Sequence, residues 1–238
     1  VDHLVAERVW QELAKGLMEQ KPSRMFEVLR DCGALARLLP EVEKLFGVPQ
    51  RADYHPEIDT GVHVMMVIDE AARRDFALPV RFAALTHDLG KATTPADILP
   101  RHIGHEMRSV QLATALCERL RVPGDCRDLA LLTARYHGDI HRAAELRPAT
   151  LVTLLERTDA LRRPERFRQL LQACQCDFNG RLGWGERPYE SPQLLLAVLA
   201  AVNRVEGGKI AAECTDKAKI PERIHAARVA AVKHFLEP

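Results

Sequence analysis

The sequence predicts an all-α fold, and three observations support this. Apolar residues recur at helical spacing along most of the 238 residues. No sustained alternation of apolar and polar residues indicates a strand. Prolines and glycines interrupt the helical pattern where helices are expected to start and stop. Because 47% of the residues are hydrophobic, the chain is long enough for one large or two small domains with a real core.

The predicted helices follow from apolar stretches bounded by these interruptions. Pro22 and Ser23 precede the second stretch, which Gly33 is expected to split, and Gly90 is expected to stop the helix that carries residues 79–89. In chain order the predicted helices cover residues 5–18, 25–39, 40–47, 62–74, 79–89, 105–120, 126–137, 149–163, 166–178 and 192–205.

The segments between these helices are predicted to be loops. Residues 49–60 and 138–147 are polar, and residues 91–104 contain two prolines and a glycine. Gly207 and Gly208 precede a basic final segment. A domain boundary is expected near residues 47–54.

Bulk composition excludes few function classes. The 34 Lys and Arg residues nearly balance 33 Asp and Glu residues, so net charge argues neither for nor against a nucleic-acid partner. An aromatic content of 5% disfavours a platform that stacks single-stranded bases. The six cysteines form no C-x-x-C pair and are expected to be reduced, mostly buried thiols of a cytoplasmic protein. No membrane span and no secretory signal are predicted. The start VDHLVAERVW, without Met, suggests a piece of a longer protein.

Histidines and acidic residues occupy positions where a core is expected. Seven of the ten histidines lie between positions 55 and 141. In the run FAALTHDLGKA, His87 and Asp88 interrupt an apolar helix face, and Asp159 interrupts another in LVTLLERTDALRR. A buried carboxylate is costly unless it is paired or binds a metal.

These residues can converge in a helical bundle. His63 lies on the helix before His87 and Asp88, and Asp159 lies on a later helix; packed side by side, the helices can bring these side chains to one point. Two imidazoles and two carboxylates suit a divalent cation. Successive helical residues point about 100° apart, so His87 and Asp88 reach one ion only where their helix ends. Taken singly, each inward histidine also fits a hydrogen-bonded core residue.

The ordered pattern H…HD…D with HDLGK intact resembles the HD superfamily of metal-dependent phosphohydrolases. The stretches QRADYHPEIDTGVH (50–63) and GHE (104–106), with the preceding helices at 6–41, are similar to the C-terminal part of the bacterial CCA-adding tRNA nucleotidyltransferase family. That resemblance spans nearly the whole chain. It implies an HD-domain helical bundle with additional N-terminal and C-terminal helices, divided into neck and body helices at 1–50, an HD domain at 51–165 and a helical tail region at 166–238.

The resemblance also implies roles for individual residues. His63, His87, Asp88 and Asp159 match the four metal ligands of the family, and His105 and His137 match positions that hold a second metal or orient phosphate. Lys91 resembles a lysine that contacts substrate phosphate, and a solvated charge is its alternative. The alternative for His137 is a helix C-cap before Gly138. Asp88 is expected to accept the proton of the attacking water, and His105 or His137 to donate one to the leaving group. His55, Glu57 and Asp59 match the segment of the family before the first ligand, and each is expected either to support that ligand or to have a structural role.

The implied activities are 2',3'-cyclic phosphodiesterase, 2'-nucleotidase and phosphatase, with Ni, Mn or Mg as the cofactor. The expected partners are tRNA and small cyclic or 2'-phosphate nucleotides, and a homodimer is possible. The glycine-serine turn and D-x-D of the nucleotidyltransferase head are missing from this sequence, so no CCA addition by this chain alone is expected. The alternative function is a tRNA-binding helical module with a non-catalytic metal site, which basic residues at 162–168 and in the final segment favour. A hydrolase of nucleotide messengers or triphosphates is a third interpretation.

Overall fold

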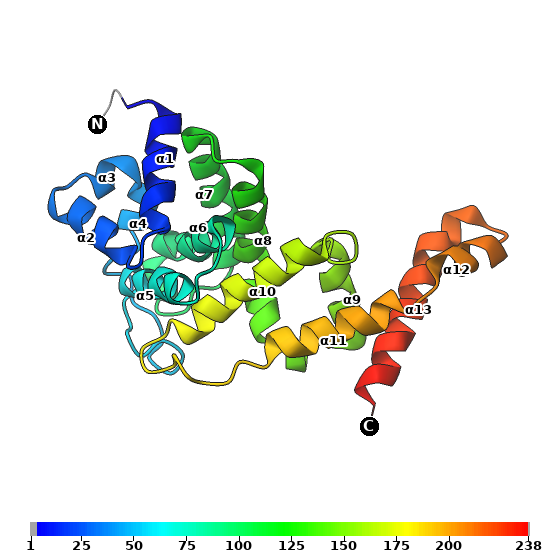
Figure 1. Ribbon diagram of the computed structural model, residues 1–238. Coiled ribbons are helices and arrows are strands. Elements are labelled where there is room, and N and C mark those ends of the chain that lie inside the picture. The colour runs from blue at the N-terminus through cyan, green and yellow to red at the C-terminus, as the bar shows by residue number, and fades with distance from the viewer. Residues whose placement is uncertain (1–3, 238) are drawn as a thin grey trace. The chain divides into compact units, whose positions relative to one another are not determined.

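The computed structural model describes residues 4–237, so residues 1–3 of the first predicted domain and Pro238 of the last lie outside the described residues. The all-α prediction is confirmed: within the described range the only strand-like feature is an isolated bridge between Pro49 and Asp59. The helices, shown in Figure 1, are α1 (Ala6–Leu17), α2 (Ser23–Asp31), α3 (Leu35–Leu38), α4 (Pro40–Glu43), α5 (Thr60–Arg73), α6 (Leu78–Thr86), α7 (His105–Leu120), α8 (Gly124–His141), α9 (Pro148–Arg157), α10 (Pro164–Asn179), α11 (Ser191–Asn203), α12 (Gly207–Glu213) and α13 (Ile220–Leu236). Short 3-10 turns are η1 (Leu89–Thr93), η2 (Ala96–Ile98), η3 (Ala143–Glu145) and η4 (Lys217–Lys219).

Most predicted interruptions lie where glycine and proline placed them, and three do not. Helix α6 ends at Thr86, before the expected stop at Gly90, which lies in turn η1. Gly33 separates α2 from α3 with a φ of 73°, a left-handed conformation that glycine adopts readily. Helix α8 runs through Gly138 to His141, so the loop expected from residue 138 begins later. Helix α9 ends at Arg157, earlier than expected, which leaves Asp159 in the turn that follows.

The chain forms two compact units, and the first contains residues up to Gly138 together with Gln169–Tyr189. Its core is built from the buried faces of α1, α2, α5, α6 and α7, where Leu17, Phe26 and Phe82 are fully buried. The rings of Trp10 and Phe82 meet edge to face at 5.1 Å, which joins α1 to α6. Helix α1 packs against α6 and α7, and Figure 1 shows it beside α7. This core is the scaffold for the histidine-rich helices.

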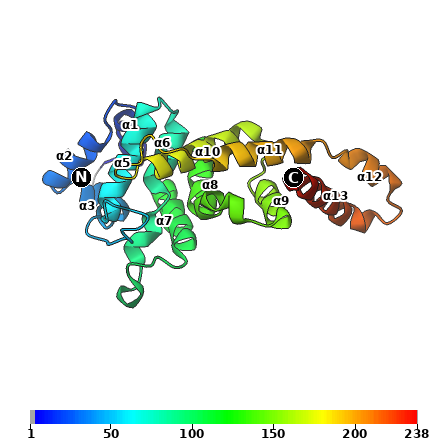
Figure 2. The same ribbon diagram turned by 90° about the horizontal axis from the view of Figure 1, so that it is seen from below.

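The second unit contains Asp139–Arg168 and Glu190–Pro238. Figure 2 shows α11 beside α9 and α13, and these three helices pack against one another. Glu156 on α9 accepts a hydrogen bond from Arg228 at 2.8 Å and contacts His225 at 2.9 Å, which links α9 to α13. The predicted division at residues 1–50, 51–165 and 166–238 follows sequence features rather than these packing units and stays a prediction.

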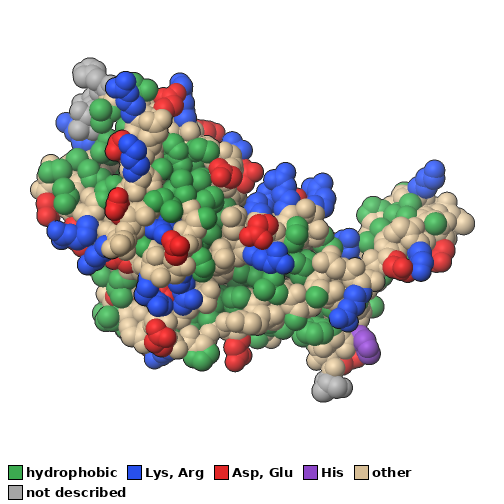
Figure 3. Space-filling view, viewed as in Figure 1, with side chains coloured by type: hydrophobic (Ala, Val, Ile, Leu, Met, Phe, Trp, Pro, Cys, Tyr) green, Lys and Arg blue, Asp and Glu red, His purple; other side chains and the backbone are tan. Residues whose placement is uncertain are grey.

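The mixed surface charge and the mostly buried cysteines are those expected from the composition. Acidic and basic side chains are interspersed on the face drawn in Figure 3. Within residues 4–237, no helix is both long and apolar enough to span a membrane. All six cysteines are free thiols, and four of them are buried. Burial raises the pKa of Cys117 to about 11 and that of Cys126 to about 12, so both remain protonated at neutral pH.

The buried carboxylate of Glu70 tests how much its hydrogen bonds with arginines stabilise the first unit. Burial would raise the pKa of this carboxyl group, but hydrogen bonds from Arg73 and Arg74, at 2.6–2.9 Å, lower it below the ordinary 4.5. A lowered folded-state pKa contributes stability above the unfolded pKa, and that stability is lost as the pH falls through the folded pKa. We expect Glu70→Gln to reduce the free energy of unfolding by about 1–3 kcal/mol at pH 7.

The difference between Glu70→Gln and wild type is expected to shrink as the pH is lowered below 4.5 in urea titrations. Glu12→Gln is the matched control, because the Glu12–Lys15 pair is 71% exposed on both sides and contributes little. An equal loss at pH 7 and at pH 3 would contradict the assignment.

Candidate metal centre

The His87–Asp88 pair lies at the corner where α6 ends. The α-helix stops at Thr86, and Asp88 has φ −110° and ψ 13°, outside helical conformation. Both side chains are only 1% exposed. The turn therefore lets two adjacent residues direct their side chains to the same buried region, as the sequence predicts.

Gly90 brings the second half of the site close to this corner. Its backbone N–H donates to Ser109 Oγ at 2.8 Å, and a methyl group added at Gly90 would collide with the backbones of His105 and Ser109. Turn η1 therefore packs directly on the first turns of α7. This close approach places His105 Nε2 3.3 Å from Asp88 Oδ1.

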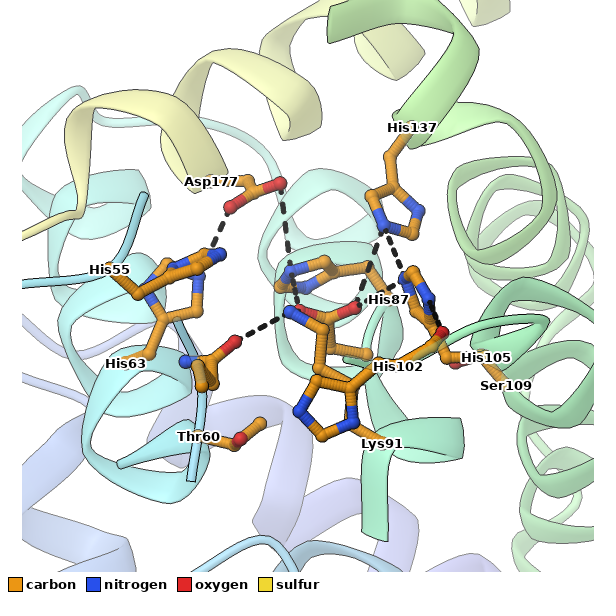
Figure 4. A network of polar contacts seen from close by, with 12 residues as sticks. His55, Thr60, His63, His87, Lys91, His102, His105, Ser109, His137 and Asp177 are labelled. Carbon is orange, nitrogen blue, oxygen red and sulfur yellow. Dashed lines mark hydrogen bonds and ion pairs between the residues drawn. The ribbon is translucent and has the colours of Figure 1, made fainter. Parts of the chain in front are cut away.

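The first group of candidate ligands comprises His63, His87 and Asp177, whose ligand atoms lie within 4.8 Å of one another. They come from α5, the end of α6 and α10, and each is at most 3% exposed. Asp177 Oδ1 is 3.0 Å from His63 Nε2, and Asp177 Oδ2 is 3.8 Å from His87 Nε2. Figure 4 shows Asp177 reaching from α10 toward both rings.

The second group comprises Asp88, His105 and His137, again within 4.8 Å of one another. Asp88 Oδ1 lies 3.3 Å from His105 Nε2 and 3.5 Å from His137 Nε2. Its other oxygen, Oδ2, lies 3.1 Å from His87 Nε2. Asp88 therefore joins the two groups through its two oxygens, and Figure 4 shows His105 and His137 on the same side of the centre.

The hydrogen bonds of three imidazoles determine which ring nitrogen faces the centre. Each Nδ1 lies within hydrogen-bond distance of a backbone carbonyl, which can only accept: His87 bonds Ala84 at 2.8 Å, His105 bonds His102 at 2.7 Å and His137 bonds Thr133 at 3.0 Å. Each Nδ1 therefore carries a proton, and in a neutral ring each Nε2 presents a lone pair. The Nε2 atoms of His105 and His137 face each other at 3.2 Å. Facing lone pairs need a cation between them, either an added proton or a metal ion.

The electrostatics of the site also favour a bound cation. Asp88 Oδ1 and His87 Nε2 are buried and have no hydrogen-bond partner. Burial would raise the pKa of Asp88, but Lys91, 2.6 Å away, and His87 hold it well below its usual range. Burial would lower the pKa of His87, but the charges of Asp88 and Asp177 raise it. The carboxylates thus attract a positive charge to the atoms that a metal would use, and the nitrogen and oxygen donors fit a divalent cation.

Comparisons with known proteins agree with this geometry. A family model described as the HD domain matches residues 56–202, which include both groups of candidate ligands. The chain belongs to the HD domain family. The resemblance identified from the HDLGK motif is therefore confirmed, and membership supports a metal-dependent phosphohydrolase domain. A second model, described as the probable RNA and SrmB-binding site of polymerase A, matches residues 1–46.

Curated relatives of this HD domain chain carry the name multifunctional CCA protein. The protein from Dechloromonas aromatica is 80% identical over 237 residues, covering 100% of this chain and 58% of the relative. Proteins from Burkholderia multivorans and Burkholderia lata are 66% and 64% identical over 238 residues, again covering 100% of this chain and 58% of each relative. The chain thus spans little more than half the length of these relatives.

Asp159 is the one predicted ligand that belongs to neither group of candidate ligands among the described residues. It lies in the second unit, in the turn after α9, with a φ of 58°. Its Oδ1 accepts from Arg162 at 2.6 Å, and its Oδ2 lies 3.6 Å from both Arg163 and Arg166. Basic side chains gather over this turn in Figure 3. Asp177 is thus the carboxylate found beside His63 and His87, and the assignment of Asp159 as a metal ligand stays a prediction.

Asp177 carried a signal that the sequence interpretation missed. On α10 it continues the buried stripe formed by Leu170 and Cys174, at helical spacing. A carboxylate in that stripe is as unusual as Asp159 in its own helix. The sequence places Asp159 near the apolar residues Leu155 and Leu161 on a helix predicted to cover 149–163, whereas α9 ends at Arg157.

Glu57 lies behind His63, as expected for a supporting residue. Its Oε1 is 2.6 Å from His63 Nδ1 and 3.2 Å from His55 Nδ1. Its Oε2 accepts from the backbone N–H of Leu182 at 3.1 Å. Asp59 has a different role, since its side chain accepts from Val62 N and caps α5. Glu57 thus holds the His63 ring in place against the turn that follows α10.

The two carboxylates can be distinguished by metal-dependent stability. Manganese at a hundredfold excess over its Kd is expected to stabilise the metal-free chain by about 2.7 kcal/mol, seen as a rise in Tm. Asp177→Asn is expected to lose most of this rise because it removes a charged ligand. Asp159→Asn is the matched control and is expected to keep it. The reverse pattern would favour Asp159 as the ligand and reject Asp177.

Proposed function

We propose that this chain is a metal-dependent phosphohydrolase that acts on 2',3'-cyclic and 2'-phosphate nucleotides. The observation that supports the hydrolase most is the convergence of three imidazole Nε2 atoms on the two oxygens of Asp88. Burying so many unshared electron pairs without a partner costs free energy, whereas a divalent cation can bind them.

The two groups of ligands support two adjacent cation positions. His63, His87 and Asp177 form one, His105 and His137 form the other, and Asp88 contributes to both. Imidazole ligands favour Ni or Mn over Mg, while the carboxylates keep Mg possible. A bound divalent ion would lower the pKa of water and neutralise charge that develops on phosphoryl oxygens.

The protein's own groups supply the remaining chemistry. Asp88 is buried and ionised, so it can accept a proton from water that attacks phosphorus. His105 is the most exposed of the proposed acid–base groups, with a side chain that is 15% exposed. In its protonated form it can donate to the departing ester oxygen, and His137 beside it is the second candidate donor. Lys91 holds Asp88 at 2.6 Å and provides a fixed positive charge for a phosphate oxygen.

We propose RNA as the macromolecular partner of the chain. The N-terminal residues 1–46 match a model for a probable RNA-binding site, and the relatives are named for CCA, which supports tRNA as a partner. The alternative, a tRNA-binding helical module whose metal site is not catalytic, rests on the same match. No nucleotidyl transfer is proposed for this chain.

Hydrolysis of 2',3'-cyclic AMP by the manganese- or nickel-loaded chain tests the proposal. Asp88→Asn is expected to lower kcat about 10³-fold, because it loses both a charged ligand and the proton acceptor. Asp88→Ala is expected to abolish turnover. Circular dichroism confirms that each variant is folded.

Asp159→Asn is the matched control and is expected to keep full activity. A folded, metal-loaded chain that binds tRNA and hydrolyses no phosphoester would reject the hydrolase and favour the binding module.

A further inference from the structure

Gln50 is a buried polar residue beside the site that the proposed chemistry leaves unused. It is 4% exposed and lies in the irregular segment before α5. Its backbone N–H donates to Ile58 O at 2.8 Å, and the neighbouring Pro49 carbonyl is 3.0 Å from His102 Nε2. Thr60 Oγ1 donates a hydrogen bond to the carbonyl oxygen of Val48, the residue before Pro49, at 2.9 Å. Hydrogen bonds therefore fix the backbone from Val48 to Gln50.

Lys91 determines the orientation of the Gln50 amide. Its ammonium donates to Gln50 Oε1 at 2.6 Å, and an ammonium group has no acceptor to offer. The oxygen must therefore face Lys91, and the NH₂ group is the other arm of the amide. Since Lys91 Nζ is also 2.6 Å from Asp88 Oδ2, the amide is one contact removed from the centre of the site.

The Nε2 atom of Gln50 is buried and has no hydrogen-bond partner. Most buried donors in folded proteins are paired, and an unpaired one costs about 1–3 kcal/mol. The chain keeps this donor beside a lysine and a carboxylate that is a proposed metal ligand. A group that enters from outside with oxygen acceptors and negative charge would satisfy it.

From this we infer that Gln50 is a substrate-binding residue, whose Nε2–H donates to a phosphoryl oxygen of the phosphoester while Lys91 neutralises its charge. The inference rests on the proposed function and adds a residue to the same site. Two adjacent donors, one charged and one neutral, match two oxygens of a tetrahedral phosphate.

Gln50→Glu is the most informative variant. It keeps the shape and the acceptor that Lys91 uses, but it removes the NH₂ donor and adds a negative charge. For 2',3'-cyclic AMP with manganese we expect KM to rise roughly 10–100-fold, with a smaller change in kcat. Binding of inorganic phosphate, measured by calorimetry on the manganese-loaded chain, is expected to weaken by a similar factor. Gln50→Met, which adds no charge, is expected to show the smaller shift of the two.

Gln111→Glu on α7 is the matched control, because it makes the same chemical change at an exposed position. It is expected to leave KM and phosphate affinity unchanged. Manganese affinity is the second readout, and it is expected to remain within about twofold of wild type in Gln50→Met.

Two outcomes would overturn the inference, and a third would reject the proposed function alone. An active wild type whose KM and phosphate affinity do not change in Gln50→Glu would reject Gln50 and leave the hydrolase intact. Loss of manganese affinity in Gln50→Met in proportion to the loss of phosphate would show a structural role only. A wild type that hydrolyses nothing rejects the proposed function, yet weaker phosphate binding in the Gln50 variants would still support the donor.

Discussion

The ionised carboxylate of Asp88, buried where α6 ends, is the constraint on which the site depends. A charge removed from water costs several kcal/mol unless it is compensated. Lys91 supplies one partner at 2.6 Å, and imidazole nitrogens approach both oxygens. Four segments of the chain must therefore meet closely: the corner at His87, turn η1, the start of α7 and the C-terminal end of α8. Gly90 allows the closest of these approaches.

The sequence predicted most of the helices and, except for Asp177, the residues that the two groups of candidate ligands bring together, for a definite reason. His63 lies on a helix, and His87 and Asp88 directly follow one, whose buried face can be identified from apolar spacing, so their inward direction follows from local pattern. The carboxylate on the later helix required knowledge of where α9 ends. That end is set by a turn in which Asp159 adopts a left-handed backbone and binds arginines, and apolar periodicity contains no information about it.

The residues that support the centre were harder to predict. Glu57 was expected near His63 only from the family resemblance, and Gln50 was not singled out. Both belong to the segment before α5, whose conformation depends on contacts with distant residues such as His102. Ile58, a β-branched residue, has a φ of 61° there, which few sequences would suggest. Irregular segments of this kind are determined by tertiary contacts, so sequence pattern alone describes them poorly.

The contact between Glu57 and the backbone of Leu182 links the interior to the surface. Leu182 is 55% exposed, yet its amide is bound to the carboxylate that also touches His63. An ion that draws the His63 ring toward Asp177 would alter this carboxylate and therefore the amide. Hydrogen exchange at the Leu182 amide would then report whether a metal ion is bound at the buried centre, without a label near the ligands.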